Sequence, residues 1–187
     1  MRFIHKLLLL PLALTSSAYA SAPSWQISPK ASSLTFIATQ NGAPVNGTFS
    51  DFTGEIHFDP KQLKDSDIKI VVNLNAISGP YDELSDTLKS ADWFNVAAYP
   101  KAIYQSKEIT QTGDKTYQAK GTLTLRDKTL PVVIQFKQAV YSATMATMEG
   151  TTIIKRTQFG VGQGEWADTK TVADEVQLKF TVMAVRK

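Results

Sequence analysis

Apolar and polar residues alternate with a period of two along most of the chain after residue 24. This alternation is typical of strands that turn one face to a core and the other to solvent. The clearest runs are Leu34 to Ala38, Ile56 with Phe58, and Ile68 to Leu74. The same pattern recurs later, in residues 102–104, 117–125, 130–136 and 176–182. The pattern predicts about eight to ten strands.

One segment, around residues 80–90, departs from this alternation. Tyr81, Leu84 and Leu88 follow one another at helical spacing. Acidic residues stand near the start of the segment and Lys89 near its end, which is the charge order that a helix dipole favours. The sequence therefore predicts one short helix in an otherwise all-β chain.

The strands are predicted to form a single domain over residues 21–187, and their number favours an antiparallel eight-stranded barrel over a stacked sandwich. Turn sequences such as Asn41-Gly42 and Asp59-Pro60 leave only short spacings between strands, whereas parallel strands need long crossovers. Closure into a barrel covers the strand edges. A barrel of this size is filled by side chains or holds one small ligand, and that difference decides what the protein does.

Residues 1–20 have the three-part pattern of a secretory signal peptide. Arg2 and Lys6 precede an apolar run that is too short to span a bilayer, and Ala18-Tyr19-Ala20 forms a small-residue cleavage site. We expect cleavage after Ala20. Because the chain has no cysteine and hence no disulfide framework, the bacterial periplasm is the expected compartment.

Charge and composition exclude several functions. Without Arg2 and Lys6, 18 of the 20 basic residues remain against 17 acidic ones, so nucleic-acid binding has little electrostatic support. The absence of cysteine excludes thiol nucleophiles and thiolate metal sites. After cleavage, His57 is the one histidine, and the alternation places it on the solvent side of its strand. We therefore predict no catalytic residue, no metal site and no covalent cofactor.

Arg156 and the many large aromatic residues stand out against this ordinary composition. Arg156 follows Ile154 at a spacing of two, which puts its guanidinium on an apolar face where it needs partners. Two roles stay open for it: an ion pair with an acid such as Asp92 or Asp174, or an anchor for an anionic or carbonyl head group at a cavity mouth. The rings belong either to a packed core or to the wall of an elongated cavity.

Several short motifs occur in a fixed order within residues 24–185. Among them are Gly47-Thr48-Phe49, Leu88-Lys89-Ser90-Ala91-Asp92-Trp93-Phe94, Gly121-Thr122-Leu123-Thr124-Leu125-Arg126 and Phe159-Gly160-Val161-Gly162. In this order they resemble the YceI-like family of exported polyisoprenoid-binding proteins. The resemblance implies an extended antiparallel barrel of lipocalin-like shape, often dimeric, around a hydrophobic tunnel that holds a long isoprenoid such as a quinone tail, without catalysis. The run from Gly162 to Trp166 is similar to a branch whose members accompany b-type membrane cytochromes.

We therefore expect a non-enzymatic periplasmic carrier of a long-chain isoprenoid, either a quinone or a polyprenyl lipid. A homodimer and a transient contact with a membrane or a b-type cytochrome are further partners that the resemblance suggests. The expected ligand-binding residues are Phe36, Phe58, Ile70, Val72, Trp93, Phe94, Tyr104, Leu123, Phe136, Arg156 and Phe180.

Two alternatives stay open at this stage. The first is a protein-interaction module, associated with a membrane b-type cytochrome, whose barrel is filled and which presents an apolar patch. The second is a lipid-acting enzyme that uses the barrel as its reaction vessel. Such an enzyme needs a carboxylate with a raised pKa inside the cavity, and Asp92, Asp174 and Glu175 are the candidates.

Overall fold

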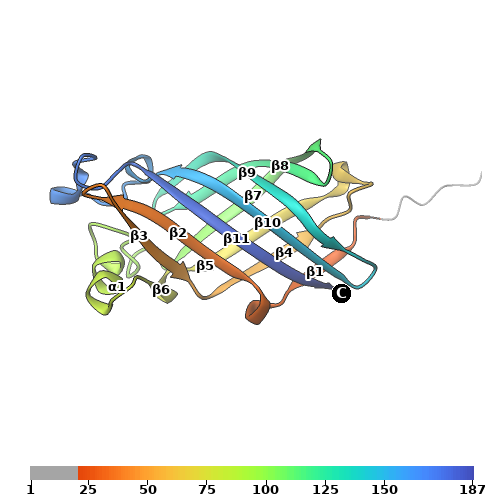
Figure 1. Cartoon of the computed structure of the whole chain (residues 1–187), viewed down its shortest axis with the longest axis horizontal. Coiled ribbons are helices and arrows are strands. Elements are labelled where there is room, and N and C mark those ends of the chain that lie inside the picture. Colours follow the sequence, from red (N-terminus) through yellow and green to blue (C-terminus); the bar gives the residue numbers. More distant parts are fainter. Residues whose placement is uncertain (1–20) are drawn as a thin grey trace, which may run out of the picture.

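The computed structural model describes residues 21–187, so the predicted signal peptide and its cleavage bond lie outside the described residues. The described part of the chain forms one antiparallel β-barrel with a single α-helix, α1 (Asp82–Lys89), as the sequence predicted (Figure 1). The strands are β1 (Ser24–Ile27), β2 (Ser33–Gln40), β3 (Ala43–Phe49), β4 (Phe52–His57), β5 (Asp67–Asn73), β6 (Ile77–Ser78), β7 (Lys101–Gly113), β8 (Thr116–Leu125), β9 (Lys128–Tyr141), β10 (Met145–Lys155) and β11 (Glu175–Arg186). Short 3-10 helices are η1 (Pro29–Ala31), η2 (Leu63–Asp65), η3 (Leu74–Ala76), η4 (Arg156–Phe159) and η5 (Gly164–Ala167). Within residues 21–187, no helix has both the length and the apolar character needed to cross a membrane.

The strands close into a ring with eight strand positions. From β7 to β11 each strand pairs with the next, and β5 pairs with β7. Each of the two remaining positions is occupied by two short strands placed end to end. As a result, β11 pairs with both β1 and β2 along the same edge. Beside them β4 joins β1 to β5, and β3 joins β2 to β6. The ring is therefore complete, and the predicted eight-stranded barrel is confirmed.

The period-two pattern determines which side chains face the interior. On β5 the apolar residues Ile68, Ile70 and Val72 all line the inside of the barrel. On β10 the pattern is less apolar, because Gly150 takes a position opposite Phe180 of β11. A β-carbon at Gly150 would lie 2.3 Å from Cζ of the Phe180 ring, so only glycine leaves room for that ring.

The two ends of the barrel are closed by different elements. At the end where β1 and the C-terminus lie (Figure 1), five rings pack against one another, and we call them the aromatic cluster: Trp25, Phe58, Tyr117, Phe136 and Tyr141. Neighbouring ring centroids in this cluster are as close as 5.3 Å. The opposite end carries α1. The interior space lies between these two closures.

Candidate functional site

The barrel interior holds two adjoining cavities. The aromatic-end cavity, of about 160 Å³, borders the aromatic cluster, and the helix-end cavity, of about 130 Å³, lies toward α1. Six side chains line both cavities, namely Leu34, Val72, Ala102, Leu123, Ile154 and Leu178. Each volume is far above the ~10–15 Å³ that one water molecule needs. The barrel is therefore hollow rather than filled by its own side chains.

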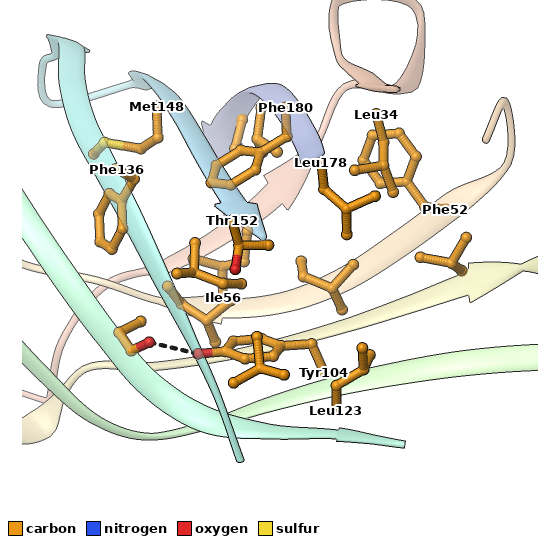
Figure 2. Close-up of a pocket in the computed structure, with 18 of the residues that line it drawn as sticks. Leu34, Phe52, Ile56, Tyr104, Leu123, Phe136, Met148, Thr152, Leu178 and Phe180 are labelled. Atoms are coloured by element: carbon orange, nitrogen blue, oxygen red, sulfur yellow. Dashed lines mark hydrogen bonds between the residues drawn. The ribbon is translucent and has the colours of Figure 1, made fainter. Parts of the chain in front are cut away.

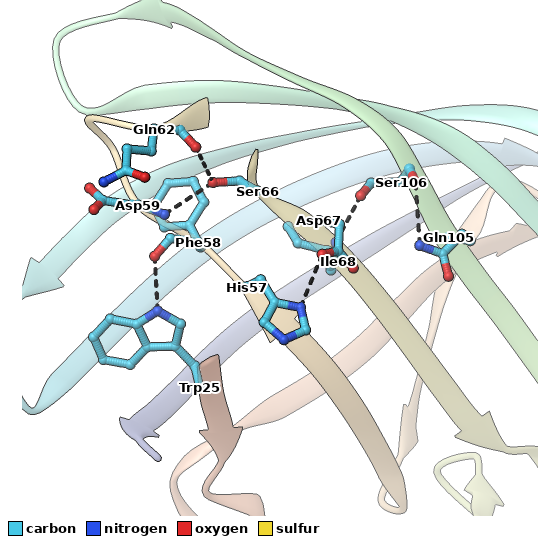
Figure 3. A network of polar contacts seen from close by, with 10 residues as sticks. All are labelled: Trp25, His57, Phe58, Asp59, Gln62, Ser66, Asp67, Ile68, Gln105 and Ser106. Carbon is cyan, nitrogen blue, oxygen red and sulfur yellow. Dashed lines mark hydrogen bonds and ion pairs between the residues drawn. The ribbon is translucent and has the colours of Figure 1, made fainter. Parts of the chain in front are cut away.

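The wall of the aromatic-end cavity is almost entirely hydrocarbon (Figure 2). Only three of its side chains carry a nitrogen or oxygen atom, and each of these atoms is already hydrogen-bonded within the protein. Nε1 of Trp25 donates to the Phe58 carbonyl at 2.9 Å, as Figure 3 shows. The Thr152 hydroxyl donates to the Val133 carbonyl at 2.9 Å.

Tyr104 is the third of these residues, and its hydroxyl donates to the Ala119 carbonyl at 2.8 Å. The phenol reaches this carbonyl across Gly121, where a β-carbon would lie 2.8 Å from the Tyr104 hydroxyl oxygen. Burial raises the pKa of Tyr104 to about 12, so the side chain is neutral at physiological pH. The aromatic-end cavity thus offers a ligand no free hydrogen-bond donor among the described residues, and it suits a hydrocarbon chain.

Arg156 is the charged residue on the wall of the helix-end cavity, and it is 3% exposed. All five of its N–H groups donate to backbone carbonyls of residues 161–173. The acceptors are Ala173 at 3.1 Å from Nε, Val161 and Gly162 at 3.0 Å from Nη1, and Trp166 and Val172 at 2.8 and 2.7 Å from Nη2. Burial lowers the pKa of the guanidinium. Because the pKa of arginine is ordinarily far above neutral, Arg156 still carries its positive charge.

This arrangement differs from both roles that the sequence left open for Arg156. Its N–H groups bond to carbonyls and not to Asp92 or Asp174, and none is left over to donate to a head group. Partial burial alone would raise the pKa of Asp174, but hydrogen bonds from Thr157, together with the positive charges of Arg156 and Lys155, outweigh it and lower that pKa. The Thr157 hydroxyl and amide lie 2.7 and 3.0 Å from Oδ1 of Asp174. Arg156 therefore fastens the segment between β10 and β11 onto the barrel.

Trp93 is the other residue of the helix-end cavity whose side chain carries a polar atom. It is 8% exposed, and its Nε1 is buried without a hydrogen-bond partner among the described residues. Its ring also lines a third, outer pocket of about 160 Å³ between α1, β2 and η5. This outer pocket is partly polar, with Gln40, Glu83 and Thr87 on its wall. Trp93 thus stands between an apolar interior and a more polar exterior.

The structure places all eleven predicted ligand-binding residues on the walls of the two inner cavities. The aromatic-end cavity has Phe58, Ile70, Tyr104, Phe136 and Phe180, the helix-end cavity has Phe36, Trp93, Phe94 and Arg156, and Val72 and Leu123 line both. Contact between these residues and a ligand stays a prediction.

The sequence reasoning missed most of the wall that β10 contributes. Ala146, Met148 and Thr152 all line the aromatic-end cavity, and their spacing by even numbers was the available signal. The signal was weak because alanine, glycine and threonine occupy most inward positions of β10, so that hydrophobicity barely alternates there.

His57 lies outside both cavities, on the surface of β4 (Figure 3). Its side chain is 42% exposed, and Nδ1 lies 3.0 Å from Oδ1 of Asp67, which is 51% exposed. Nearby, the buried Ser106 hydroxyl accepts a hydrogen bond from the backbone N–H of Ile68 at 2.8 Å. This bond adds to the backbone hydrogen bonds between β5 and β7. The predicted position of His57 on the solvent side of its strand is confirmed.

Comparison with known proteins places this geometry among relatives. The model of the YceI-like domain matches residues 25–184. The chain is 31% identical over 146 residues to a UPF0312 protein of Azotobacter vinelandii, covering 75% of this chain and 74% of that one.

Solved structures with the same fold are also found. The crystal structure of Burkholderia cenocepacia BcnA is similar, with a TM-score of 0.80 and 30% identity, covering 84% of this chain and 98% of that one. A domain from Saccharophagus degradans, described as polyisoprenoid-binding and implicated in plant cell wall breakdown, shares the fold with a TM-score of 0.71 at 15% identity. That alignment covers 88% of this chain and 99% of the domain.

Proposed function

Because the chain belongs to the YceI-like family, we propose that it binds one long-chain isoprenoid, a quinone or polyprenyl lipid, in its barrel and carries it without chemical change. We further propose that it does so in the periplasm, after export by the pattern in residues 1–20. The observation that carries the proposal is the pair of adjoining cavities, whose shared wall consists of hydrocarbon side chains.

The driving force for such a ligand follows from the chemistry of the wall. Burying apolar surface is worth roughly 25 cal/mol per Å², so a prenyl chain that hides on the order of 500 Å² gains about 12 kcal/mol before the costs of ordering are deducted. Tyr104 and Thr152 do not oppose this gain, because their hydroxyls keep their partners in the protein. A long hydrocarbon chain with methyl branches therefore suits the interior better than a polar metabolite.

The features required by the two alternatives find less support. A filled barrel would favour the protein-interaction module, whereas this barrel is hollow. The enzyme needs a carboxylate with a raised pKa inside the cavity, and neither inner cavity is lined by an Asp or Glu of the described chain. Of the candidates, Asp174 has a lowered pKa, and Asp92 and Glu175 are exposed.

The decisive experiment identifies what the protein carries. We would purify the mature protein from the periplasm of its own host, record native mass spectra, and analyse the extracted lipid by chromatography and mass spectrometry. The expected result is a bound mass that matches an intact isoprenoid. A protein that is recovered empty, and that also fails to take up a tetraprenyl benzoquinone in vitro, would overturn the proposal.

A pair of variants on β7 tests whether the cavity is the binding site. Ala102 lines both inner cavities, so Ala102→Phe puts a phenyl ring where they meet and should abolish quinone uptake. The matched control is Ile103→Phe, the next residue along the strand, which lines neither cavity. Both variants must show the same unfolding transition as the unmodified protein. Equal uptake by Ala102→Phe and Ile103→Phe would place the ligand outside the barrel.

A further inference from the structure

The N–H of Trp93 differs from every other side-chain N–H or O–H on the walls of the two inner cavities. The others, on Trp25, Tyr104, Thr152 and Arg156, all donate to backbone carbonyls. Among the described residues that line these cavities, only Trp93 has a buried Nε1 without a hydrogen-bond partner. Leaving a buried donor unpaired is unfavourable, so the position fits an acceptor that arrives from outside the chain.

The position of Trp93 matches the end of a bound lipid. The aromatic cluster closes the far end of the barrel, so a tail that fills both cavities leaves its head near α1. Trp93 lines both the helix-end cavity and the outer pocket. Trp93 therefore lies where the hydrocarbon surroundings give way to the polar side chains of Gln40, Glu83 and Thr87.

The surroundings of Trp93 hold the ring in place and favour a partial negative charge. Its centroid lies 5.6 Å from that of Trp166, and 5.8 Å from the guanidinium carbon of Arg156. The backbone carbonyl of Trp93 accepts a hydrogen bond from Arg126. Within residues 21–187, no carboxylate lies within ion-pair distance of Arg156, although Asp174 is near enough to interact with its charge. The guanidinium thus keeps a positive charge beside the Trp93 ring.

We propose that Nε1–H of Trp93 donates a hydrogen bond to an oxygen of the ligand head group, and that Trp93 thereby selects isoprenoids with an oxygen acceptor at one end. The proposal rests on the proposed function, because it needs a ligand tail in the barrel. A quinone carbonyl and a prenol hydroxyl both supply such an oxygen. Arg156 acts on the head group through its charge alone, since its own donors are used.

Binding of three probes to the full mature protein tests this. A tetraprenyl benzoquinone and geranylgeraniol carry an oxygen acceptor, whereas phytane is a branched hydrocarbon without one. Trp93→Phe keeps an aromatic ring and removes the N–H. We expect it to weaken binding of both oxygen-bearing probes by about 3- to 10-fold, the range of one hydrogen bond, and to change phytane binding by less than about 2-fold. The difference between quinone and geranylgeraniol tells which oxygen is preferred.

Trp25→Phe is the matched control, because it removes an indole N–H at the other end of the barrel. Any loss that it causes should be the same factor for all three probes. NMR supplies a second readout: the indole ¹H–¹⁵N signal that is missing in Trp93→Phe should move downfield when quinone or geranylgeraniol binds, and should not do so with phytane.

The outcomes separate this inference from the function on which it rests. If the unmodified protein binds none of the three probes, both proposals are wrong. If it binds them and Trp93→Phe weakens all three equally, or the indole signal does not respond to an oxygen-bearing probe, the head-group contact is wrong while the lipid-binding barrel stands.

Discussion

Replacing Arg156 by methionine tests whether this guanidinium fastens the segment between β10 and β11 to the barrel. Methionine keeps much of the aliphatic stem and removes five hydrogen bonds to backbone carbonyls. Each buried carbonyl that is left unpaired costs about 1–3 kcal/mol, and relaxation of the segment recovers part of this. For five such carbonyls, with part of the cost recovered, we expect a loss of about 3–5 kcal/mol of unfolding free energy.

The assay is urea unfolding at neutral pH, followed by far-UV circular dichroism. With a slope of about 2 kcal/mol per M, the unfolding midpoint of Arg156→Met should fall by about 1.5–2.5 M. Arg156→Lys keeps the charge but loses the planar set of five donors, so its midpoint should lie in between. The exposed neighbour supplies the control, because Lys155→Met should change the unfolding free energy by no more than about 0.5 kcal/mol.

A loss below about 1 kcal/mol in Arg156→Met would refute this reasoning. It would mean that the carbonyls of residues 161–173 find water or one another at little cost. Hydrogen exchange adds a local check: amides of residues 157–173 should lose protection in Arg156→Met before those of β8 and β9 do. Equal loss across the barrel would show that the guanidinium stabilises the whole fold and not this segment in particular.

Two further predictions concern the barrel wall. Because burial raises the folded-state pKa of Tyr104 from 10.0 to about 12, its contribution to stability should be fully present below pH 10 and be lost between pH 10 and about 12. Replacing Tyr104 by Phe should therefore flatten that part of the profile of unfolding free energy against pH, measured by urea unfolding. An unchanged slope would contradict the raised pKa. Ser106→Ala leaves the amide of Ile68 without its acceptor and should cost about 1–3 kcal/mol in the same assay. The exposed Asp67→Asn should cost less than about 1 kcal/mol, and the reverse ranking of these two variants would be evidence against the hydrogen bond.

The sequence by itself determined the class of fold and the inward face of most strands. Alternation in β5 is a local property of Ile68, Ile70 and Val72, so it can be read without knowing which strand lies beside them. The short helix α1 was equally accessible, because its apolar spacing and its terminal charges lie within one segment. The ordered motifs added the family, which the match over residues 25–184 confirms.

Only the tertiary structure decided that the barrel is hollow and how its polar groups are paired. Cavity volume depends on the distance between opposite walls, which strand number and tilt set for the ring as a whole. The acceptors of Arg156 are backbone carbonyls. Because every residue has a backbone carbonyl, the residue types alone could not identify these partners. The unpaired N–H of Trp93 likewise depends on what lies around it in space, because the sequence alone does not show whether an acceptor lies within hydrogen-bond distance.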